Sequence, residues 1–400
     1  MNEPVLITGA GVVSSIGLNK EEVLSSLLSR KSGIGPPMYL RTKHKEFPVG
    51  EVKLTNDEMA SMLNIAPDIP KTRTSLMGML ALKEALGEAS LMSCDLRNVG
   101  MISGTTVGGM DKSELYYLDF LSNDTRNQFI LTHDCGACTE MQADYFGDFS
   151  FVSTISTACS SSANALILGA NMIRNGEMDI VVAGGSECIT KFHLNGFNSL
   201  MILDTAPCRP FDATRSGLNL GEGAAYLVLE SQSSAIKRQV KPIALLSGYG
   251  NACDAFHQTA SSPNGEGAFR AMAQALDNAG IEKGKVDYIN AHGTGTPNND
   301  LSESIAIKRL FGDKIPPVSS TKSFTGHTTS ASGAIEAVIC ILAMRNQFLP
   351  ENLNWKDKME DGIIPVNNSK LAAPISHVLC NSFGFGGNDS SLLLTHPLVS

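Results

Sequence analysis

The sequence lacks any run of about 18 consecutive apolar residues, the minimum for a membrane-spanning helix. Its longest apolar helical stretch, residues 334–344, is interrupted by Glu336. The opening Met-Asn-Glu-Pro also lacks the basic segment that begins a secretory signal. We therefore expect a soluble, unprocessed, cytoplasmic protein with no membrane contact.

Positive charge is also scarce. Lys and Arg number 31 against 40 Asp and Glu, which gives a formal net charge of -9. Nonspecific nucleic-acid binding needs a clustered basic surface, so this balance argues against it. Only 18% of residues are charged, 42% are hydrophobic and 37 are glycine, and no segment resembles a flexible linker. This composition and the length of 400 residues favour two tightly joined α/β units.

The nine cysteines do not form a disulfide or zinc pattern. Their odd number and scattered positions favour a reducing compartment. Cys135 and Cys138 form a C-x-x-C, but there is no second such pair, and a structural zinc site needs four ligands. We expect no metal; thiol redox chemistry at this pair stays open as an alternative.

A dinucleotide-binding fingerprint is incomplete as well. Gly9 and Gly11 follow a strand-like run, but Ser14 stands where a third glycine is needed. No acidic residue closes a clear second strand. We therefore predict a packed turn at this place.

Apolar strand-like runs alternate with amphipathic helical patterns along the whole chain. Such alternation predicts an α/β fold with largely parallel sheets. The expected strands include residues 5–9, 179–185, 225–229, 243–246, 288–289, 378–379 and 391–394. Helices are expected at 268–279 and 302–311, each ending at a glycine. We place a boundary near residues 239–242, which gives halves 1–240 and 241–400.

Cys159 lies where a strand-like run gives way to a helical pattern that stops at Gly176. Free backbone N–H groups and the helix dipole at such a junction stabilise a thiolate and hold an oxyanion. A cysteine in this position therefore indicates a nucleophile.

Three more segments place polar or glycine-rich turns directly after apolar runs, as catalytic loops do. They are N-A-H-G-T-G-T-P with His292, S-S-T-K-S-F-T-G-H with Lys322 and His327, and C-N-S-F-G-F-G-G-N with Phe385. Two histidines flanked by Gly and Thr are expected to donate N–H groups to a thioester oxygen. The glycines around Phe385 allow that loop to move, with Phe385 as its gate.

Together these four motifs resemble the β-ketoacyl-acyl-carrier-protein synthases of the thiolase superfamily, and most closely the elongating type with a Cys-His-His centre. The resemblance runs in order over essentially the whole chain. It implies a thiolase-like fold, in which two related α/β halves form a five-layered αβαβα body, and a homodimer. The first half would carry Cys159, and the second His292, His327 and Lys322.

The resemblance also implies roles for further residues. The backbone N–H groups of Cys159 and Phe385 would form the oxyanion hole. A protonated Lys322 would act as an electrostatic and positioning group. Supporting positions behind the site would be Asp300, Glu303, Glu336, Thr294 and Thr296. A basic patch for the acidic carrier protein would include Lys71, Arg73 and Arg126. Asn388 replaces the usual threonine after the last glycine, and the Cys135 segment departs from the family's small and aliphatic residues.

The implied activity is the decarboxylative condensation of a cysteine-bound acyl group with malonyl-acyl-carrier protein in fatty-acid elongation. No cofactor is expected apart from the pantetheine arm on the carrier. Three alternatives stay open: a ketosynthase of a specialised polyene or polyketide pathway, including the active half of a heterodimer; a thiolase, with Cys380 as its second cysteine; and a non-catalytic chain-length subunit. Such subunits typically lack the nucleophile, so Cys159 argues against the last.

Overall fold

The computed structural model describes residues 5–66, 69–368 and 374–398. Residues 1–4, from which we inferred that a basic leader is lacking, lie outside the described residues. Ten strands form one continuous sheet in the order β3-β2-β4-β5-β1-β6-β10-β9-β7-β8. The strands are β1 Val5–Ser14, β2 Val99–Gly104, β3 Phe151–Ile155, β4 Ile180–Glu187, β5 Gly223–Ser231, β6 Ala244–Cys253, β7 Tyr288–Asn290, β8 Val318–Ser319, β9 His377–Gly384 and β10 Asn388–Thr395.

The two halves of this sheet repeat one topology. The order β3-β2-β4-β5-β1 in the first half matches β8-β7-β9-β10-β6 in the second, strand for strand and direction for direction. The halves meet where β1 pairs antiparallel with β6, Val5 opposite Leu246 and Ile7 opposite Ala244. The boundary at residues 240 and 241 falls between helix α8 (Gln232–Arg238) and β6 and stays a prediction.

The expectation of largely parallel sheets is wrong. Among the described strands only β2–β3, β2–β4, β7–β8 and β7–β9 pair in parallel, and the other neighbours are antiparallel. One reason is the tight connection at Phe385–Gly387, which reverses the chain between β9 and β10 as in a hairpin. Each half is therefore a mixed sheet.

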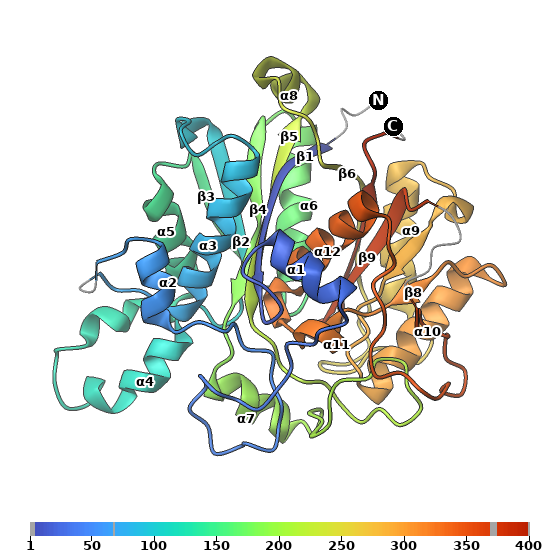
Figure 1. The fold of residues 1–400 in the computed structure, drawn as a ribbon, viewed down its shortest axis with the longest axis horizontal. Coiled ribbons are helices and arrows are strands. Elements are labelled where there is room, and N and C mark those ends of the chain that lie inside the picture. Colours follow the sequence, from blue (N-terminus) through green and yellow to red (C-terminus); the bar gives the residue numbers. More distant parts are fainter. Residues whose placement is uncertain (1–4, 67–68, 369–373, 399–400) are drawn as a thin grey trace.

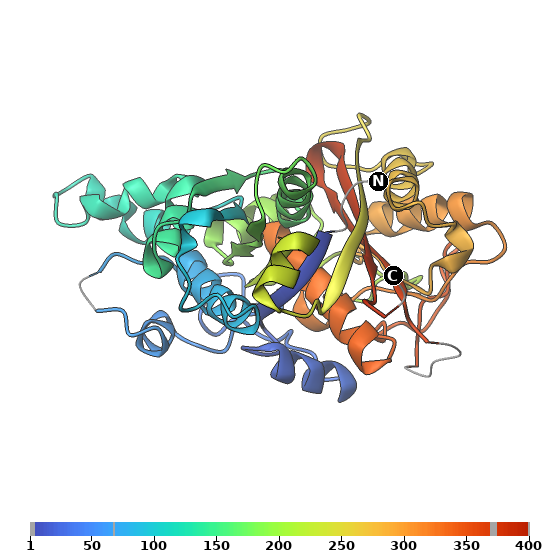
Figure 2. The ribbon, with the colours of Figure 1, turned by 90° about the horizontal axis from the view of Figure 1, so that it is seen from above.

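Helices cover the outer faces of both halves of the sheet and fill the space between the halves (Figures 1 and 2). Helix α3 (Arg73–Glu88) packs on the outer face of the first half, and α9 (Glu266–Ala279) with α10 (Pro297–Phe311) on that of the second. Helices α6 (Ser161–Arg174) and α12 (Ser332–Asn346) lie between the two halves and contact strands of both. These layers form the expected αβαβα body. The other helices are α1 Lys20–Leu28, α2 Asn56–Met62, α4 Met110–Phe120, α5 Cys135–Phe146, α7 Lys191–Ser199 and α11 Lys322–Thr325.

Glycine pairs explain the close packing of the outer helices. Gly9 and Gly11 lie inside β1, not in a turn as predicted, and α3 crosses directly over them. A Cβ at Gly11 would come 2.0 Å from the carbonyl oxygen of Ala81. In the second half a Cβ at Gly250 of β6 would come 2.1 Å from that of Ala271 in α9. The G-x-G pattern therefore serves helix-on-sheet packing in both halves.

Within residues 5–66, 69–368 and 374–398, no helix has both the length and the apolar character to cross a bilayer.

Candidate active site

Cys159 lies in a sharp turn between β3 and α6. The residue before it, Ala158, has φ of 52°, a left-handed conformation that is strained for a residue with a Cβ. This turn places Cys159 just before the first residue of α6, Ser161, and only 6% of its surface is exposed. The helix ends as predicted, with Gly176 at φ of 70°.

Burial governs the state of the Cys159 sulfur. It raises the pKa of the Cys159 thiol to about 11, while the charge of Lys322 and the backbone N–H groups of Phe385 and Cys159 act in the opposite direction. At neutral pH a group with this pKa is a thiol at rest. The two N–H groups do lie against the sulfur, where they can hold an oxyanion on an attacked carbonyl.

His292 follows β7 and is 2% exposed. Its Nδ1 lies 3.3 Å from the Nζ of Lys322, which donates to it. The imidazole proton is therefore on Nε2. Burial and the charge of Lys322 lower the pKa of His292 well below its ordinary value, so the ring is neutral at pH 7.

His327 reaches the same state through different partners. Its Nδ1 accepts the backbone N–H of Thr329 at 3.3 Å, with the Oγ of Ser332 at 3.1 Å. A backbone N–H only donates, so the proton of His327 is also on Nε2. Burial and Lys322 lower the pKa of His327 well below its ordinary value.

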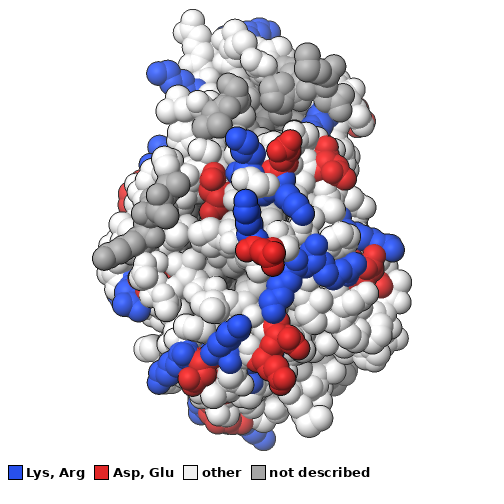
Figure 3. Space-filling view, turned by 90° about the vertical axis from the view of Figure 1, so that its right-hand side faces the viewer, with Lys and Arg blue, Asp and Glu red and all other residues white. Residues whose placement is uncertain are grey.

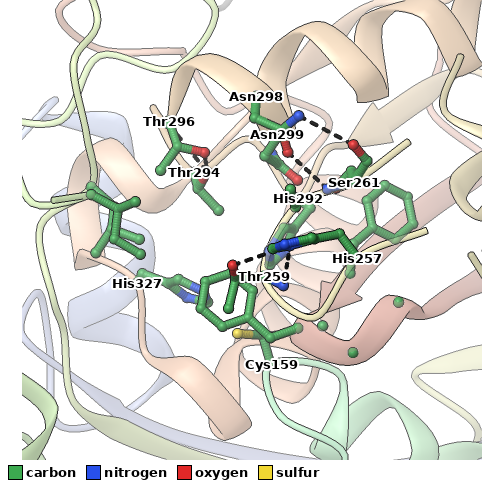
Figure 4. A pocket seen from close by; sticks show the side chains of 18 of the residues that line it. Cys159, His257, Thr259, Ser261, His292, Thr294, Thr296, Asn298, Asn299 and His327 are labelled. Atoms are coloured by element: carbon green, nitrogen blue, oxygen red, sulfur yellow. Dashed lines mark hydrogen bonds between the residues drawn. The ribbon is translucent and has the colours of Figure 1, made fainter. Parts of the chain in front are cut away.

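The two imidazoles face one cavity together with Cys159 (Figure 4). Their ring centroids are 5.2 Å apart and their planes meet at 81°. Both line the cavity, so two neutral N–H donors and one thiol converge on a space of about 320 Å³. This arrangement can hold a carbonyl or enolate oxygen next to a nucleophilic sulfur.

Lys322 lies behind the histidines and is completely buried. Its Nζ is 2.5 Å from Oε1 of Glu336 on α12. Burial raises the pKa of Glu336 to about 7, while Lys322 opposes that rise. Glu336 thus balances the ammonium, as expected for a positioning group rather than a base.

The other supporting residues hold the His292 loop in place. Glu303 accepts the backbone N–H groups of His292 at 2.9 Å and Gly293 at 2.8 Å. Asp300 accepts that of Gly295 at 3.1 Å. Neither acid contacts Lys322; they fix the loop from the next helix, α10. Thr294 and Thr296 line the cavity and share a hydrogen bond of 2.8 Å.

The end of β9 and the loop after it connect the nucleophile to the rest of the site. Ser382 donates to the backbone carbonyl of Cys159 at 3.0 Å, and Asn381 donates to Glu303 at 3.1 Å. Phe385 stacks on Phe197 of α7 with centroids 5.9 Å apart. Gly386 has φ of 82°, which permits the reversal next to this aromatic pair.

Asn388, where this chain departs from the pattern of the resemblance, ties that loop to α6. Its Oδ1 accepts from Ser160 at 2.8 Å, Asn164 at 2.7 Å and Asn251 at 3.0 Å. A threonine Oγ1 is attached to Cβ, one bond nearer the backbone than the Oδ1 of an asparagine. The departure therefore supplies an anchor beneath the nucleophile turn.

Sequence reasoning missed several residues of the cavity wall, among them Phe197, His257 and Asp389. We gave no role to His257, although the turn-rich residues 257–262 that follow β6 resemble the loops around the other two histidines. Nothing in the sequence around Phe197 indicated a contact with Phe385.

Cys380 does not support the thiolase alternative. It is 1% exposed in β9, belongs to the apolar core beneath the cavity and does not line the cavity. A second catalytic cysteine would have to reach the reacting carbon. The described cavity therefore holds Cys159 as its one cysteine.

The Cys135 and Cys138 pair lies apart from the cavity, at the start of α5. Cys138 is fully buried with Sγ 3.2 Å from the Oγ1 of Thr72, and burial raises the pKa of both thiols. In the part of the chain that the structure describes, no group of three or more His, Cys, Asp or Glu side chains is placed to hold a metal ion.

We expect the Cys135→Ser and Cys138→Ser double variant to condense within about threefold of the wild type, since both thiols have a raised pKa and neither lines the cavity. Condensation rates and metal analysis check this. A disulfide under mild oxidation, with activity lost and restored by reductant, would instead make the pair a redox switch. Stoichiometric zinc in the wild-type protein would also contradict the expectation.

Arg73 is wrong as a member of an exposed carrier-protein patch. It is 8% exposed, and its guanidinium binds Glu222, with Nε to Oε2 at 2.9 Å. The residue begins α3, whose inner face packs on β1 and β5, so its side chain is directed into the protein. Lys71 is half-buried, and Arg126 is exposed over the ring of Tyr116. Their role stays a prediction.

Known families match both halves of the chain. Residues 2–235 match the model of the beta-ketoacyl synthase N-terminal domain, and residues 243–356 match that of its C-terminal domain. The 3-oxoacyl-(acyl-carrier-protein) synthase 1 of Haemophilus influenzae is 34% identical, over 97% of this chain and 98% of the relative. The synthase 2 of Coxiella burnetii is also 34% identical, over 98% of each chain.

Solved structures agree with the sequence relatives. The ishigamide ketosynthase/chain length factor superposes with a TM-score of 0.92 at 32% identity, covering 99% of this chain and 100% of that one. The ketosynthase ApeO in complex with its chain length factor ApeC, from Xenorhabdus doucetiae, gives 0.84 at 28% identity over 98% of each chain. With its nucleophile turn, paired histidines and repeated halves, the chain belongs to the beta-ketoacyl synthase family.

Proposed function

We propose that this protein condenses a cysteine-bound acyl group with malonyl-acyl-carrier protein and releases CO₂ and a β-ketoacyl-acyl-carrier protein. The observation that carries the proposal is the convergence of the Cys159 thiol with two neutral Nε2–H donors, His292 and His327, in one cavity. The names of the curated relatives, 3-oxoacyl-(acyl-carrier-protein) synthases, support the same reaction.

The first half-reaction transfers the acyl group. The Cys159 sulfur attacks the thioester carbonyl, and the backbone N–H groups of Cys159 and Phe385 hold the oxyanion. The carrier thiolate leaves and takes up the proton that Cys159 loses. No separate base is consumed, which fits a resting thiol between two neutral histidines.

The second half-reaction makes the carbon–carbon bond. Malonyl loses CO₂, and the electron pair of the broken bond forms an enolate whose oxygen accepts the Nε2–H groups of His292 and His327. The enolate carbon then attacks the acyl carbonyl and expels the Cys159 thiolate, which takes up a proton from solvent. Lys322 and Glu336 keep the histidines neutral and oriented.

We also propose that the enzyme has no cofactor of its own. Decarboxylation supplies the carbanion, and the pantetheine arm arrives on the carrier protein. The nine cysteines are unpaired in the structure, which supports a reducing, cytoplasmic location.

The donor used in the second half-reaction tests the proposal. After acylation, the enzyme is offered either malonyl-carrier protein, isotopically labelled in the free carboxyl, or acetyl-CoA. We expect labelled CO₂ equal to the β-ketoacyl product with malonyl, and no product with acetyl-CoA. Condensation of acetyl-CoA without CO₂ would make the enzyme a thiolase.

A second candidate is the ketosynthase of a polyene or polyketide pathway, as a homodimer or as the active half of a heterodimer. The likeness to the ishigamide protein favours it. The described edge strand β3, with Phe151 and Val152 exposed by 37% and 38%, offers a place for a partner strand to pair, which supports a dimer in either pathway. Activity with acyl donors of graded length and unsaturation separates the two pathways. Native mass spectrometry of the protein alone, and of the protein with a co-expressed partner, separates the homodimer from the heterodimer.

A further inference from the structure

Glu187, the last residue of β4, is a fully buried carboxylate that takes no part in the proposed chemistry. Carboxylates on the outer face of the second half lie among basic side chains (Figure 3); Glu266, for example, binds Arg270 at 2.8 Å and Arg309 at 2.9 Å. The hydrogen-bond donors to Glu187 within the described chain are all neutral. A buried carboxylate needs such donors in place of water, so the groups around it are held firmly.

Five groups of the described chain donate to Glu187. Its Oε1 accepts the hydroxyl of Thr105 at 2.9 Å and the backbone N–H of Val107 at 3.2 Å. Its Oε2 accepts the backbone N–H and the hydroxyl of Thr106 at 2.8 Å and 2.5 Å, and the hydroxyl of Ser330 at 2.5 Å. The first four donors follow β2 in the first half, whereas Ser330 comes from the second half. Glu187 therefore joins one half of the protein to the other.

Ser330 lies in the segment that holds the ring of His327. It is the middle residue of the 3₁₀ turn η5 (Thr329–Ala331) and is completely buried. The residue before it, Thr329, donates its backbone N–H to Nδ1 of His327 at 3.3 Å. Ser332, two residues after Ser330, places its Oγ 3.1 Å from the same nitrogen. Ser330 thus stands between the two residues that orient His327.

The backbone of this turn is strained. Thr329 has φ of 45°, a left-handed conformation that is unfavourable for a β-branched residue. Strained backbone persists only where the surrounding structure fixes it. The contacts to Nδ1 of His327 therefore depend on an anchor outside the turn.

Glu187 supplies that anchor. Backbone hydrogen bonds hold His327 before the turn, and the hydroxyl of Ser162 holds the start of α12 after it. Between these points, over residues 328–331, the bond from Ser330 to Glu187 is the one hydrogen bond in the described chain that reaches a distant segment. The geometry of the turn therefore rests on this contact between the halves.

We propose that Glu187 and Ser330 are positioning residues for His327, an inference that rests on the proposed function. Their hydrogen bond fixes the strained turn, and the turn fixes the two partners of Nδ1. These partners keep the Nε2–H of His327 directed at the enolate oxygen. Neither Glu187 nor Ser330 lines the cavity, so both act through the histidine.

The two half-reactions depend on His327 to different degrees. Decarboxylation uses its Nε2–H, and a displacement of about 1 Å in a positioned group can cost about 10²-fold in rate. Acyl transfer uses the backbone N–H groups of Cys159 and Phe385 instead. Loosening the turn should therefore slow decarboxylation and spare acylation.

The test compares Ser330→Ala with the control Thr105→Val. Each variant removes one hydroxyl that donates to Glu187, but only Ser330 belongs to the turn after His327. Thr105 also accepts the backbone N–H of Gly108 at 3.3 Å, so the control loses more hydrogen bonds than the test variant. A loss of stability alone, measured by thermal unfolding, should therefore be at least as large in the control.

We expect Ser330→Ala to slow single-turnover CO₂ release by the acylated enzyme about tenfold, a part of the loss that a fully displaced donor causes. Its KM for malonyl-carrier protein and the rate of Cys159 acylation should stay within about twofold of the wild type. In Thr105→Val the ratio of the decarboxylation rate to the acylation rate should stay within about twofold of the wild-type ratio.

Nitrogen NMR of protein labelled in histidine gives a readout that a general loss of stability would not move. In the wild type His327 should show a protonated Nε2 and an unprotonated Nδ1, assigned from the signals that are lost in His327→Ala. In Ser330→Ala the two nitrogen shifts should approach each other, because a loosened turn lets both tautomers form. Thr105→Val should keep the wild-type shifts.

Glu187→Gln tests the other partner. An amide nitrogen cannot accept the donors that one carboxylate oxygen accepts, so this variant should also slow decarboxylation more than acylation. Because the two residues act as a unit, Glu187→Gln/Ser330→Ala should be no more than about twofold slower than the slower single variant. A loss equal to the product of the two single losses would contradict the proposal. Ser330→Ala and its control decide the question if Glu187→Gln does not fold.

Equal losses of acylation and decarboxylation in Ser330→Ala, or an equal loss of decarboxylation in Thr105→Val, would overturn the positioning role. Wild-type rates and wild-type nitrogen shifts in Ser330→Ala would overturn it as well. Failure of the acylated wild type to release CO₂ from malonyl-carrier protein would instead contradict the proposed function.

Discussion

Replacing Cys159 with alanine abolishes condensation in the proposed mechanism, lowering the rate by at least about 10³. Cys159 is the one cysteine that lines the described cavity, and the backbone N–H groups that hold the oxyanion converge on its sulfur. No other thiol of the described chain lines this cavity, so none is placed to carry the acyl group as a thioester. Product formation with acyl- and malonyl-carrier protein, followed by mass spectrometry, measures the effect.

The Cys159→Gln variant separates condensation from decarboxylation. Its amide resembles the acylated side chain, so it should lose condensation but keep or gain decarboxylation of malonyl-carrier protein. That result would show that the histidines still hold the enolate. Normal condensation by Cys159→Ala would refute covalent catalysis at this residue.

The His292→Ala and His327→Ala variants should each slow condensation by about 10² to 10³, the usual loss when one oxyanion donor is removed. Both rings are neutral and offer Nε2–H to the cavity, so each removal takes away one hydrogen bond to the enolate oxygen. Acylation of Cys159 should suffer less, because backbone N–H groups hold that oxyanion. Rapid-quench measurements of acylation and decarboxylation separate the two effects.

His257→Ala is the matched control. His257 also lines the cavity, but its Nδ1 accepts from Thr259 at 3.1 Å on an exposed loop, outside the histidine pair. We expect its decarboxylation rate to stay within about fivefold of the wild type. Equal losses of acylation and decarboxylation in both His292→Ala and His327→Ala would contradict the enolate-holding role.

Local sequence patterns were enough to predict most of the catalytic residues and some helix ends. Strand-like runs followed by glycine or polar turns located Cys159, His292, Lys322 and His327, because catalytic loops follow strand ends. Glycine after a helical pattern marked the end of α9 at Gly280, which adopts φ of 65°. Such signals depend on neighbours in the chain, so they can be read without the fold.

Other features depend on contacts between distant segments. Phe197 meets Phe385, and Asn388 meets Asn164, only after the halves have packed. The burial of Arg73 against Glu222 likewise requires the position of α3. The raised pKa of Cys159 follows from desolvation, which no local motif encodes.

Single-turnover intact-mass analysis tests the central claim most directly. Purified protein is mixed with acyl-carrier protein, freed of excess donor and then given malonyl-carrier protein. The account predicts one acyl mass per chain, mapped to Cys159 by peptide sequencing, which disappears as one equivalent of β-ketoacyl-carrier protein forms. An acyl group on any other residue, or product formation with no acylated intermediate, would contradict it.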